Sequence, residues 1–198
     1  MAPRTSITDP IRVDWLPALG GAGEPAGQHA GRPLAQRGSV GLTFAPGKHQ
    51  RSLQGVHWER DLSADLDRLV TFERVQVVAC LLEDHELLSL GIPGYVREVT
   101  ARGLRLLRLP IRDATTPPAR EPVSALLTHL DDAVARGERV AVHCAGGLGR
   151  AGTIAGCWLV RNGTRPDVAL KILREVRGPG CPETQAQREY ILGWPPRG

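Results

Sequence analysis

The sequence predicts one α/β domain over residues 1–198, with a central, mostly parallel, twisted β-sheet flanked by helices. Two observations favour this fold class. Short apolar segments alternate with amphipathic ones along the chain, which is typical of strand, helix, strand units in a parallel sheet. The length of 198 residues also fits one domain of ordinary size. Such units cross over with a right hand and place a binding site at the carboxyl ends of the strands.

The N-terminal part contains two expected strands and one expected loop. Residues 11–16 and 40–44 have the apolar character of short strands, and Ala-Pro-Gly turns the chain after the second. Between them, residues 20–37 are rich in Gly, Pro and Ala with few large apolar side chains, so we expect a mobile loop there. Segments 1–8 and 194–198 are expected to be tails.

The next segment has clear helical and strand patterns. Residues 62–70 place their leucines on one helical face, with Asp61 or Ser63 available as the N-cap. Residues 75–82 are almost entirely apolar, as in a strand that helices cover on both faces. Further along, the pattern predicts helices at 83–90 and 95–102 and a strand at 104–109.

Residues 111–122 read IRDATTPPAREP, which has too many prolines for a helix or a central strand. Long loops without secondary structure of their own are usually functional and often act as lids. Beyond this loop, the apolar periodicity and the Gly and Pro boundaries predict a helix at 122–136, a strand at 140–143, and helices at 154–160, at 166–177 and from near 182.

Composition excludes several classes of protein. The content of 41% hydrophobic and 23% charged residues is that of a globular chain, and the opening MAPRTSITDP lacks the apolar core of a signal peptide. The net charge is +4, but no run of five like charges occurs, which argues against nucleic-acid binding. The four cysteines form no CxxC pair, so neither a structural zinc site nor a disulfide framework is expected. We therefore expect a cytoplasmic protein with no metal and no membrane contact.

One segment, RVAVHCAGGLGRAGT from Arg139, carries the chemistry. It joins an apolar strand to an apolar helix, and three glycines lie between Cys144 and Arg150. A glycine-rich turn lets successive backbone N–H groups point inward, and a helix N-terminus favours an anion. The same field and a neighbouring cation favour the thiolate form of Cys144. Arg150 supplies a planar cation that can bind two phosphate oxygens at once.

The spacing of Cys144 and Arg150 is common by chance, so its context decides. The residues six positions after Cys80, Cys157 and Cys181 are not arginine, and none of these cysteines stands between a strand and a helix. The alternative for Cys144 is a small buried hydrophobic residue. That alternative leaves the glycines and Arg150 unexplained. The sequence therefore predicts a phosphate-binding loop with a cysteine nucleophile.

The segment HCAGGLGR, residues 143–150, resembles the signature of the cysteine-dependent protein tyrosine and dual-specificity phosphatases. Within that superfamily the likeness is closest to the kinase-associated phosphatases. It extends through IRVDWL from Ile11, VVACLLEDHEL from Val77, LPIRD from Leu109 and REVRGPGCPETQAQREYI from Arg174. The resemblance implies a dual-specificity phosphatase-like fold and hydrolysis of a phosphomonoester through a cysteinyl-phosphate intermediate.

The resemblance also implies roles for individual residues. The phosphate would be bound by the loop residues Ala145, Gly146, Gly147, Leu148, Gly149 and Arg150, and Cys144 would be the nucleophile. We assign the proton donor to Asp113, since it lies in the long loop and follows proline by three, as in the kinase-associated phosphatases. Asp84 and Glu121 are weaker loop candidates, and Asp131 and Asp132 lie within the expected helix at 122–136.

Three further residues match family positions. His143 resembles the histidine that orders the loop, although a plain core histidine has the same signature. Gln187 matches the glutamine that positions the hydrolytic water, and Gln185 is its rival. Cys80 ends a neighbouring strand and matches a cysteine that traps the oxidised nucleophile as a disulfide in some members.

The chain departs from the family at two positions. Ala151 stands where most members have Ser or Thr, whose hydroxyl stabilises the leaving thiolate, so we expect a burst of product followed by slow turnover. Thr153 is not expected to replace that hydroxyl. Ala114 stands where glycine is frequent, which predicts a stiffer loop closure.

The sequence thus predicts a monomeric protein phosphatase of the tyrosine or dual-specificity type that needs no cofactor and acts on a phosphorylated protein. Two alternatives stay open. One is a non-catalytic or very slow phosphate-recognition module. The other is a phosphatase of a small-molecule, lipid or RNA phosphate.

Overall fold

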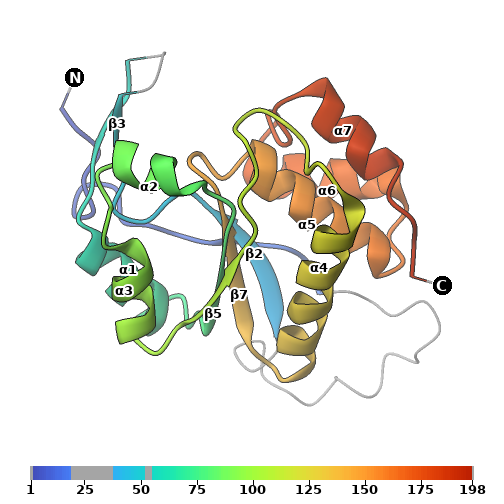
Figure 1. The fold of residues 1–198 in the computed structure, drawn as a ribbon, viewed down its shortest axis with the longest axis horizontal. Coiled ribbons are helices and arrows are strands. Elements are labelled where there is room, and N and C mark those ends of the chain that lie inside the picture. The colour runs from blue at the N-terminus through green and yellow to red at the C-terminus, as the bar shows by residue number, and fades with distance from the viewer. Residues whose placement is uncertain (1, 19–37, 52–54, 198) are drawn as a thin grey trace.

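A five-stranded mixed sheet forms the centre of the molecule (Figure 1). The computed structural model describes residues 2–18, 38–51 and 55–197, so the loop expected at 20–37 lies outside the described residues. The strand order is β1-β2-β7-β5-β6, with only β1 antiparallel to its neighbour. The strands are β1 Asp14–Trp15, β2 Ser39–Thr43, β5 Val77–Cys80, β6 Arg105–Arg108 and β7 Arg139–His143.

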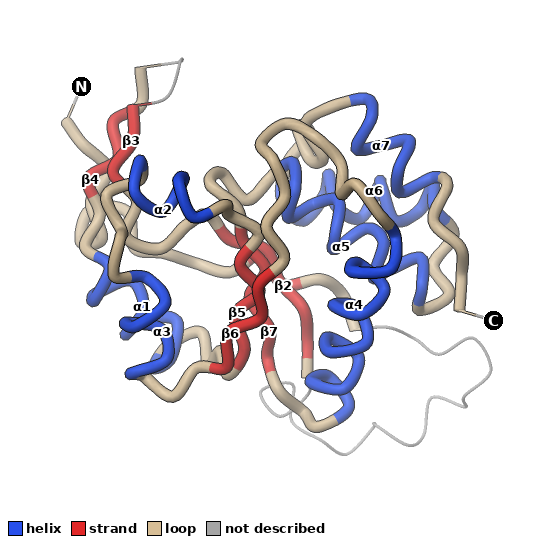
Figure 2. Tube along the Cα trace, viewed as in Figure 1, coloured by secondary structure: helices blue, strands red, loops and turns tan. Residues whose placement is uncertain are grey.

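Helices cover both faces of this sheet, as Figures 1 and 2 show. One face carries α1 Leu62–Thr71, α2 Asp84–Ser89 and α3 Tyr95–Ala101, and the other carries α4 Arg120–Ala135, α5 Gly149–Arg161, α6 Pro166–Arg177 and α7 Gln185–Leu192. The predicted α/β class with a mostly parallel sheet is confirmed. None of the described helices is long and apolar enough to cross a membrane.

The apolar run at 75–82 contains the internal strand β5, as predicted, although the strand covers only Val77–Cys80. In β5, Val77 and Ala79 pack with the α4 to α7 side, whereas Val78 and Cys80 pack with the α1 to α3 side. Alternate side chains therefore enter two hydrophobic cores, one on each face. A strand with two covered faces has no position for a polar side chain, which explains the unbroken pattern.

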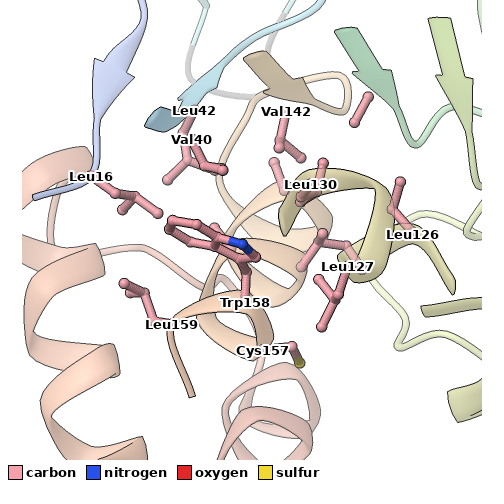
Figure 3. Packing of buried hydrophobic residues seen from close by; sticks show 14 of the residues in the cluster. Leu16, Val40, Leu42, Leu126, Leu127, Leu130, Val142, Cys157, Trp158 and Leu159 are labelled. Carbon is pink, nitrogen blue, oxygen red and sulfur yellow. The ribbon is translucent and has the colours of Figure 1, made fainter. Parts of the chain in front are cut away.

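Helix α5 is the most buried helix of the described chain, because nearly all its side chains lie in the core. Figure 3 shows Trp158 of α5 between Leu16 and Leu42 on one side and Leu130 on the other. The indole Nε1 donates a hydrogen bond of 2.9 Å to Asp131 on α4, so the buried ring keeps its polar partner.

Several element boundaries differ from the expectation. Strand β1 covers only two residues rather than 11–16, and α7 begins at Gln185 rather than near 182. Helix α5 begins at Gly149, five residues before the apolar run that predicted it, since the small residues of the motif already adopt helical geometry. A separate two-stranded sheet, β3 His49–Arg51 with β4 His57–Glu59, was not predicted, because its polar residues show no apolar alternation.

A buried ion pair fixes the turn that follows β2. Arg60 and Asp65 form two hydrogen bonds of 2.7 and 2.8 Å, and both side chains are almost fully buried. The backbone N–H of Gly47 also donates to the Asp65 carboxylate, at 2.9 Å. Arg60 further donates to the carbonyl of Asp9, at 2.7 Å. This network holds the N-terminal segment and the Gly47 turn beside the central strands.

Candidate active site

The phosphate loop, residues 144–150, lies at the carboxyl end of the central strand β7. Its cysteine follows the last residue of β7, and its last two residues form the first turn of α5. Strands β2 and β5 flank β7 in parallel on either side. Parallel α/β sheets bind ligands at this edge. The predicted strand, loop, helix context of Cys144 is therefore confirmed.

The loop turns tightly around the sulfur of Cys144. The backbone N–H of Gly147 points to Cys144 Sγ at 3.3 Å. Gly147 has a φ of +73°, and a Cβ at this position would collide with the carbonyl oxygen of Thr43. Only glycine combines that backbone conformation with so close an approach. The turn itself thus requires glycine at position 147.

Arg177, at the end of α6, holds the outside of the loop. Its Nε donates to the Gly147 carbonyl and its Nη2 to the Gly146 carbonyl, both at 2.9 Å, while Asp14 binds Nη1 at 2.6 Å. Two consecutive carbonyls are thereby turned away from the sulfur, which leaves loop N–H groups free to face an anion. Sequence reasoning missed Arg177, although it lies in the segment REVRGPG that carries the family likeness.

Arg150 connects the loop to two other segments. Its guanidinium, 1% exposed, donates to both carboxylate oxygens of Glu86 at 2.6 and 2.8 Å and to the carbonyl of Ile111 at 2.9 Å. Nη2 also lies 2.8 Å from Asp113 Oδ1. The structure thus brings the two predicted residues Arg150 and Asp113 into contact. The buried Nε of Arg150 has no hydrogen-bond partner within the described residues, so this one N–H donor is left for a ligand.

Glu86 on α2 was not predicted as a site residue. Burial alone would raise its pKa, but hydrogen bonds from Arg150 and from the backbone of Glu83 outweigh burial, and the pKa of Glu86 is lowered. Arg150 in turn has a raised pKa: burial lowers it, but Glu86 and Cys144 more than compensate. Both partners are therefore charged. In the sequence, the segment EDHEL shows a glutamate at this position but no pattern that predicts its contact with Arg150.

The acid loop, residues 109–119, connects β6 to α4. Its candidate proton donor Asp113 has a side chain that is 72% exposed, in contrast to the buried guanidinium that it contacts. The next residue, Ala114, has a φ of +57°, in the left-handed region that residues with a Cβ rarely adopt. Strained backbone of this kind clusters at functional sites. The observed strain falls beside the predicted acid.

Gln187 lies in the site, and its rival Gln185 does not. The buried amide of Gln187 donates to the carbonyl of Thr115 in the acid loop at 3.1 Å and accepts from the N–H of Thr184 at 3.1 Å. Its amide also lies against the first residue of α5. Gln185 instead donates to Glu189 on the exposed surface of α7. Gln187 therefore connects α7, the acid loop and the start of α5.

His143 is fully buried beneath the phosphate loop. Its Nδ1 lies 3.3 Å from the carbonyl of Cys144 and its Nε2 lies 2.5 Å from the hydroxyl of Tyr95. Since a carbonyl only accepts, Nδ1 carries the proton and Nε2 accepts from Tyr95. Burial lowers the pKa of His143 to about 4, so the ring is neutral near pH 7. A neutral ring with both nitrogens bonded orients the loop.

The hydroxyl that Ala151 lacks is not supplied by its neighbour. Ala151 is fully buried, and the Thr153 hydroxyl donates to the Gly149 carbonyl at 2.8 Å, within its own helix. Cys80 is buried at the end of β5, and burial raises its pKa to about 11. All four cysteines are free thiols in the structure.

A cleft of about 460 Å³ opens over the loop. Its walls come from the β3 segment, α2 and the acid loop, and include Gln50, His85, Ser89, Arg112, Asp113 and Ala145. Most of the lining residues are polar, and of the contacting pair Asp113 and Arg150 only Asp113 lines the cleft. No cluster of three or more His, Cys, Asp or Glu side chains that could hold a metal occurs in the part of the chain that the structure describes.

Comparisons with known proteins agree with this geometry. A sequence model described as "Polymorphic toxin system, DSP-PTPase phosphatase" matches residues 57–164, more than half of the chain. The chain is 26% identical over 184 residues to cyclin-dependent kinase inhibitor 3 of Rattus norvegicus, which covers 92% of this chain and 77% of that protein.

Two solved structures share the fold. One is kinase associated phosphatase (KAP) with a serine in place of its catalytic-site cysteine, at 23% identity and a TM-score of 0.74, covering 91% of this chain and 92% of that one. The other is the active form of Tk-PTP, at 31% identity and a TM-score of 0.62, covering 77% of this chain and 88% of that one.

Proposed function

The chain belongs to the family of polymorphic toxin system DSP-PTPase phosphatases, and from this membership we propose that it is a cysteine-dependent protein phosphatase of the dual-specificity type. The substrate would be a phosphorylated protein, and the reaction would hydrolyse its phosphomonoester through a cysteinyl-phosphate intermediate. The observation that carries this proposal is that the buried guanidinium of Arg150, the last residue of the phosphate loop, contacts the candidate acid Asp113 and attracts the sulfur of Cys144 electrostatically.

In the first step, the Cys144 thiolate attacks phosphorus, and a bond forms between sulfur and phosphorus. The bond from phosphorus to the leaving oxygen breaks, and Asp113 gives its proton to that oxygen. Arg150 and the N–H groups of the phosphate loop hold the equatorial oxygens as their charge rearranges. The contact of Asp113 with Arg150 supports this assignment, since Arg150 is the arginine of the phosphate loop.

In the second step, a water molecule attacks phosphorus and the cysteinyl-phosphate bond breaks. The Asp113 carboxylate takes a proton from that water, and the amide of Gln187 positions it. The position of Gln187, bonded to the acid loop and against the start of α5, supports this role. The thiolate of Cys144 leaves as the free nucleophile, and inorganic phosphate is released.

One observation favours a second candidate function. The leaving thiolate has no hydroxyl donor at Ala151, and Thr153 uses its hydroxyl within α5. A site that captures phosphate well but releases the thiolate poorly would work as a phosphate-recognition module with very slow turnover. Both functions use the same loop, so turnover must be measured separately from binding.

Steady-state hydrolysis of an aryl phosphate tests the proposal. Cys144→Ser should abolish turnover and still bind phosphate, whereas Arg150→Ala should lose both. Asp113→Ala should lose about 10²- to 10⁴-fold in kcat with poor leaving groups and much less with good ones. Asp132→Ala, an exposed aspartate on α4, is the matched control and should leave kcat unchanged.

Two results would decide against a phosphatase. Turnover that survives in Cys144→Ser would exclude a cysteinyl-phosphate route. Phosphate binding without any turnover in the unmodified protein would favour the recognition module. A panel of phosphopeptides, phosphoinositides and phosphorylated RNA ends, assayed for phosphate release, tests the substrate class. Preferential release from the lipids or RNA would replace the phosphoprotein assignment.

A further inference from the structure

Lys48 is a buried cation that the reaction above does not use. It follows Gly47 in the turn after β2, and it is only 4% exposed. Its Nζ donates to the carbonyl of Ala145 in the phosphate loop at 3.2 Å. Its ammonium also lies 4.3 Å from the ring centre of Trp58 and 5.1 Å from that of Phe44. One face of the ammonium thus meets the loop, and the aromatic rings cover the rest.

No carboxylate among the described residues forms an ion pair with Lys48. Two other cations, Arg60 and Arg177, act on Lys48 electrostatically. Each already has a carboxylate partner, since Arg60 pairs with Asp65 and Arg177 pairs with Asp14. Lys48 itself forms no ion pair within residues 2–18, 38–51 and 55–197. A buried ammonium beside two paired guanidinium groups is costly unless a further anion faces it.

The sulfur of Cys144 is that anion when it is ionised. Cys144 directly precedes Ala145, the residue whose carbonyl Lys48 binds. We propose that Lys48 is a positioning residue, which holds the Ala145 peptide in place and acts as the buried counter-cation of the Cys144 thiolate. The inference rests on the proposed function in that it concerns the same nucleophile, but it can be measured without any turnover.

The electrostatics agree with this geometry. Burial lowers the pKa of Lys48 to about 8, Cys144 opposes that shift, and Arg177 and Arg60 add to it. The side chain is therefore mostly protonated at pH 7 and loses its charge as the pH rises through 8. Attraction between two titrating groups is reciprocal, because the thiolate favours the ammonium as much as the ammonium favours the thiolate.

Stability does not explain why a lysine stands here. A methionine has a similar length, packs well against aromatic rings, and carries no charge that must be desolvated. The Ala145 carbonyl would keep its second donor, the backbone N–H of Ala45 at 3.2 Å. A purely structural role would therefore be filled at least as well by methionine. The charge itself is what the position provides.

The first test is alkylation of Cys144 by iodoacetamide, followed by peptide mapping across a pH series. Lys48→Met should raise the pH at which the alkylation rate is half-maximal by about one unit. Below that pH, alkylation should be about tenfold slower than in the unmodified protein. Lys48→Arg keeps a cation and should restore most of the rate. Lys171→Met, the chain's other lysine and exposed on α6, is the matched control. An alkylation profile that Lys48→Met leaves unchanged would overturn the inference.

The second test needs no variant at Lys48, so it stands even if Lys48→Met fails to fold. The chain has two lysines, so selective ¹³Cε labelling gives two side-chain resonances that titrate separately. The Lys48 signal should titrate near pH 8, and in Cys144→Ser it should titrate at a lower pH, because the thiolate is gone. A midpoint that is the same with and without the thiol would refute the coupling. Coupling without phosphate release would refute only the proposed function.

Discussion

Both Nη atoms of Arg150 donate to the carboxylate of Glu86, at 2.6 and 2.8 Å, in an end-on, bidentate pair. The same carboxylate accepts the backbone N–H of Glu83 at 2.9 Å, as half of a capping box at the start of α2. A helix cap on one face of the sheet therefore orients the phosphate-binding arginine. The orientation of the guanidinium depends on a segment far from the phosphate loop in sequence.

We expect Glu86→Gln to impair both stability and activity. The buried Arg150 would keep its charge and lose its buried counter-ion, since its other carboxylate partner, Asp113, is 72% exposed, and this should cost at most about 3 kcal/mol in the free energy of unfolding. The guanidinium would also lose its fixed orientation, so kcat/KM should fall about 10- to 100-fold. Urea unfolding and aryl phosphate kinetics measure the two effects. Asp84→Asn is the matched control, since Asp84 pairs with Arg108 but is 89% exposed. Equal losses in both variants would contradict the specific role of Glu86.

We expect Ala151→Ser to speed the second chemical step. A serine hydroxyl at this buried position would donate to the departing thiolate, so the burst expected of the unmodified protein should become a linear time course. Pre-steady-state release of the leaving group at stoichiometric enzyme measures the change. Thr153→Val removes a hydroxyl that is bonded to Gly149 and should leave the shape of the time course unaltered. A linear course in the unmodified protein would refute the expectation.

Local sequence patterns predicted the helices and strands whose buried and exposed positions follow a regular order along the chain. Residues 75–82 are apolar because both faces of β5 are covered, and Pro166 begins α6 as expected. Glycines revealed the turn of the phosphate loop, because only a tight backbone geometry explains them. These features depend on neighbours in the sequence, so sequence alone contains them.

The partners of the loop could not be found in that way. Glu86, Lys48, Arg177 and Tyr95 lie in four separate segments, and each is ordinary in its local context. Their roles follow from tertiary contacts that no periodicity encodes. The short sheet of β3 and β4 was missed because its polar residues show no apolar alternation, and its bridge from Trp58 to Arg4 joins segments far apart in sequence.

Cys80 provides a test of redox protection. We expect stoichiometric peroxide to oxidise Cys144 and then form a reducible link to Cys80, detected by peptide mapping. The pKa of Cys80 is about 11, so little of the attacking Cys80 thiolate is present at pH 7. The link should therefore form more quickly at higher pH. Cys157→Ser is the matched control, since it removes a different buried thiol. Irreversible oxidation of Cys144 without any link would remove the idea.

Ala114 should hold the acid loop under strain. A residue with a Cβ in the left-handed region costs roughly 1 kcal/mol, and glycine avoids most of that cost. We therefore expect Ala114→Gly to raise the free energy of unfolding by about 0.5–1 kcal/mol in urea denaturation. Ala125→Gly, at an exposed position inside α4, should lower it by about 1 kcal/mol. A loss of stability at both positions would contradict the strain.

His143 should make the fold sensitive to acid. Its pKa is about 4 in the folded protein, because burial disfavours the charged ring, against 6.5 for the ordinary side chain. Between these values the unfolded chain binds more protons than the folded one, so stability is lost as the pH falls from 6.5 towards 4. The loss should reach about 3 kcal/mol at pH 4.

Urea unfolding at pH 7 and pH 4 isolates this contribution when the protein is compared with His143→Gln. Glutamine does not titrate, so the variant should lose about 3 kcal/mol less over this interval, although it should be less stable at pH 7 through the weakened contact with Tyr95. Carboxylates titrate in both proteins and cancel in the difference. His85→Gln, on the exposed surface of α2, should lose as much as the unmodified protein. An identical acid loss in His143→Gln would mean that the pKa of His143 is the same in the folded and the unfolded protein, and that burial beneath Cys144 does not keep the ring neutral.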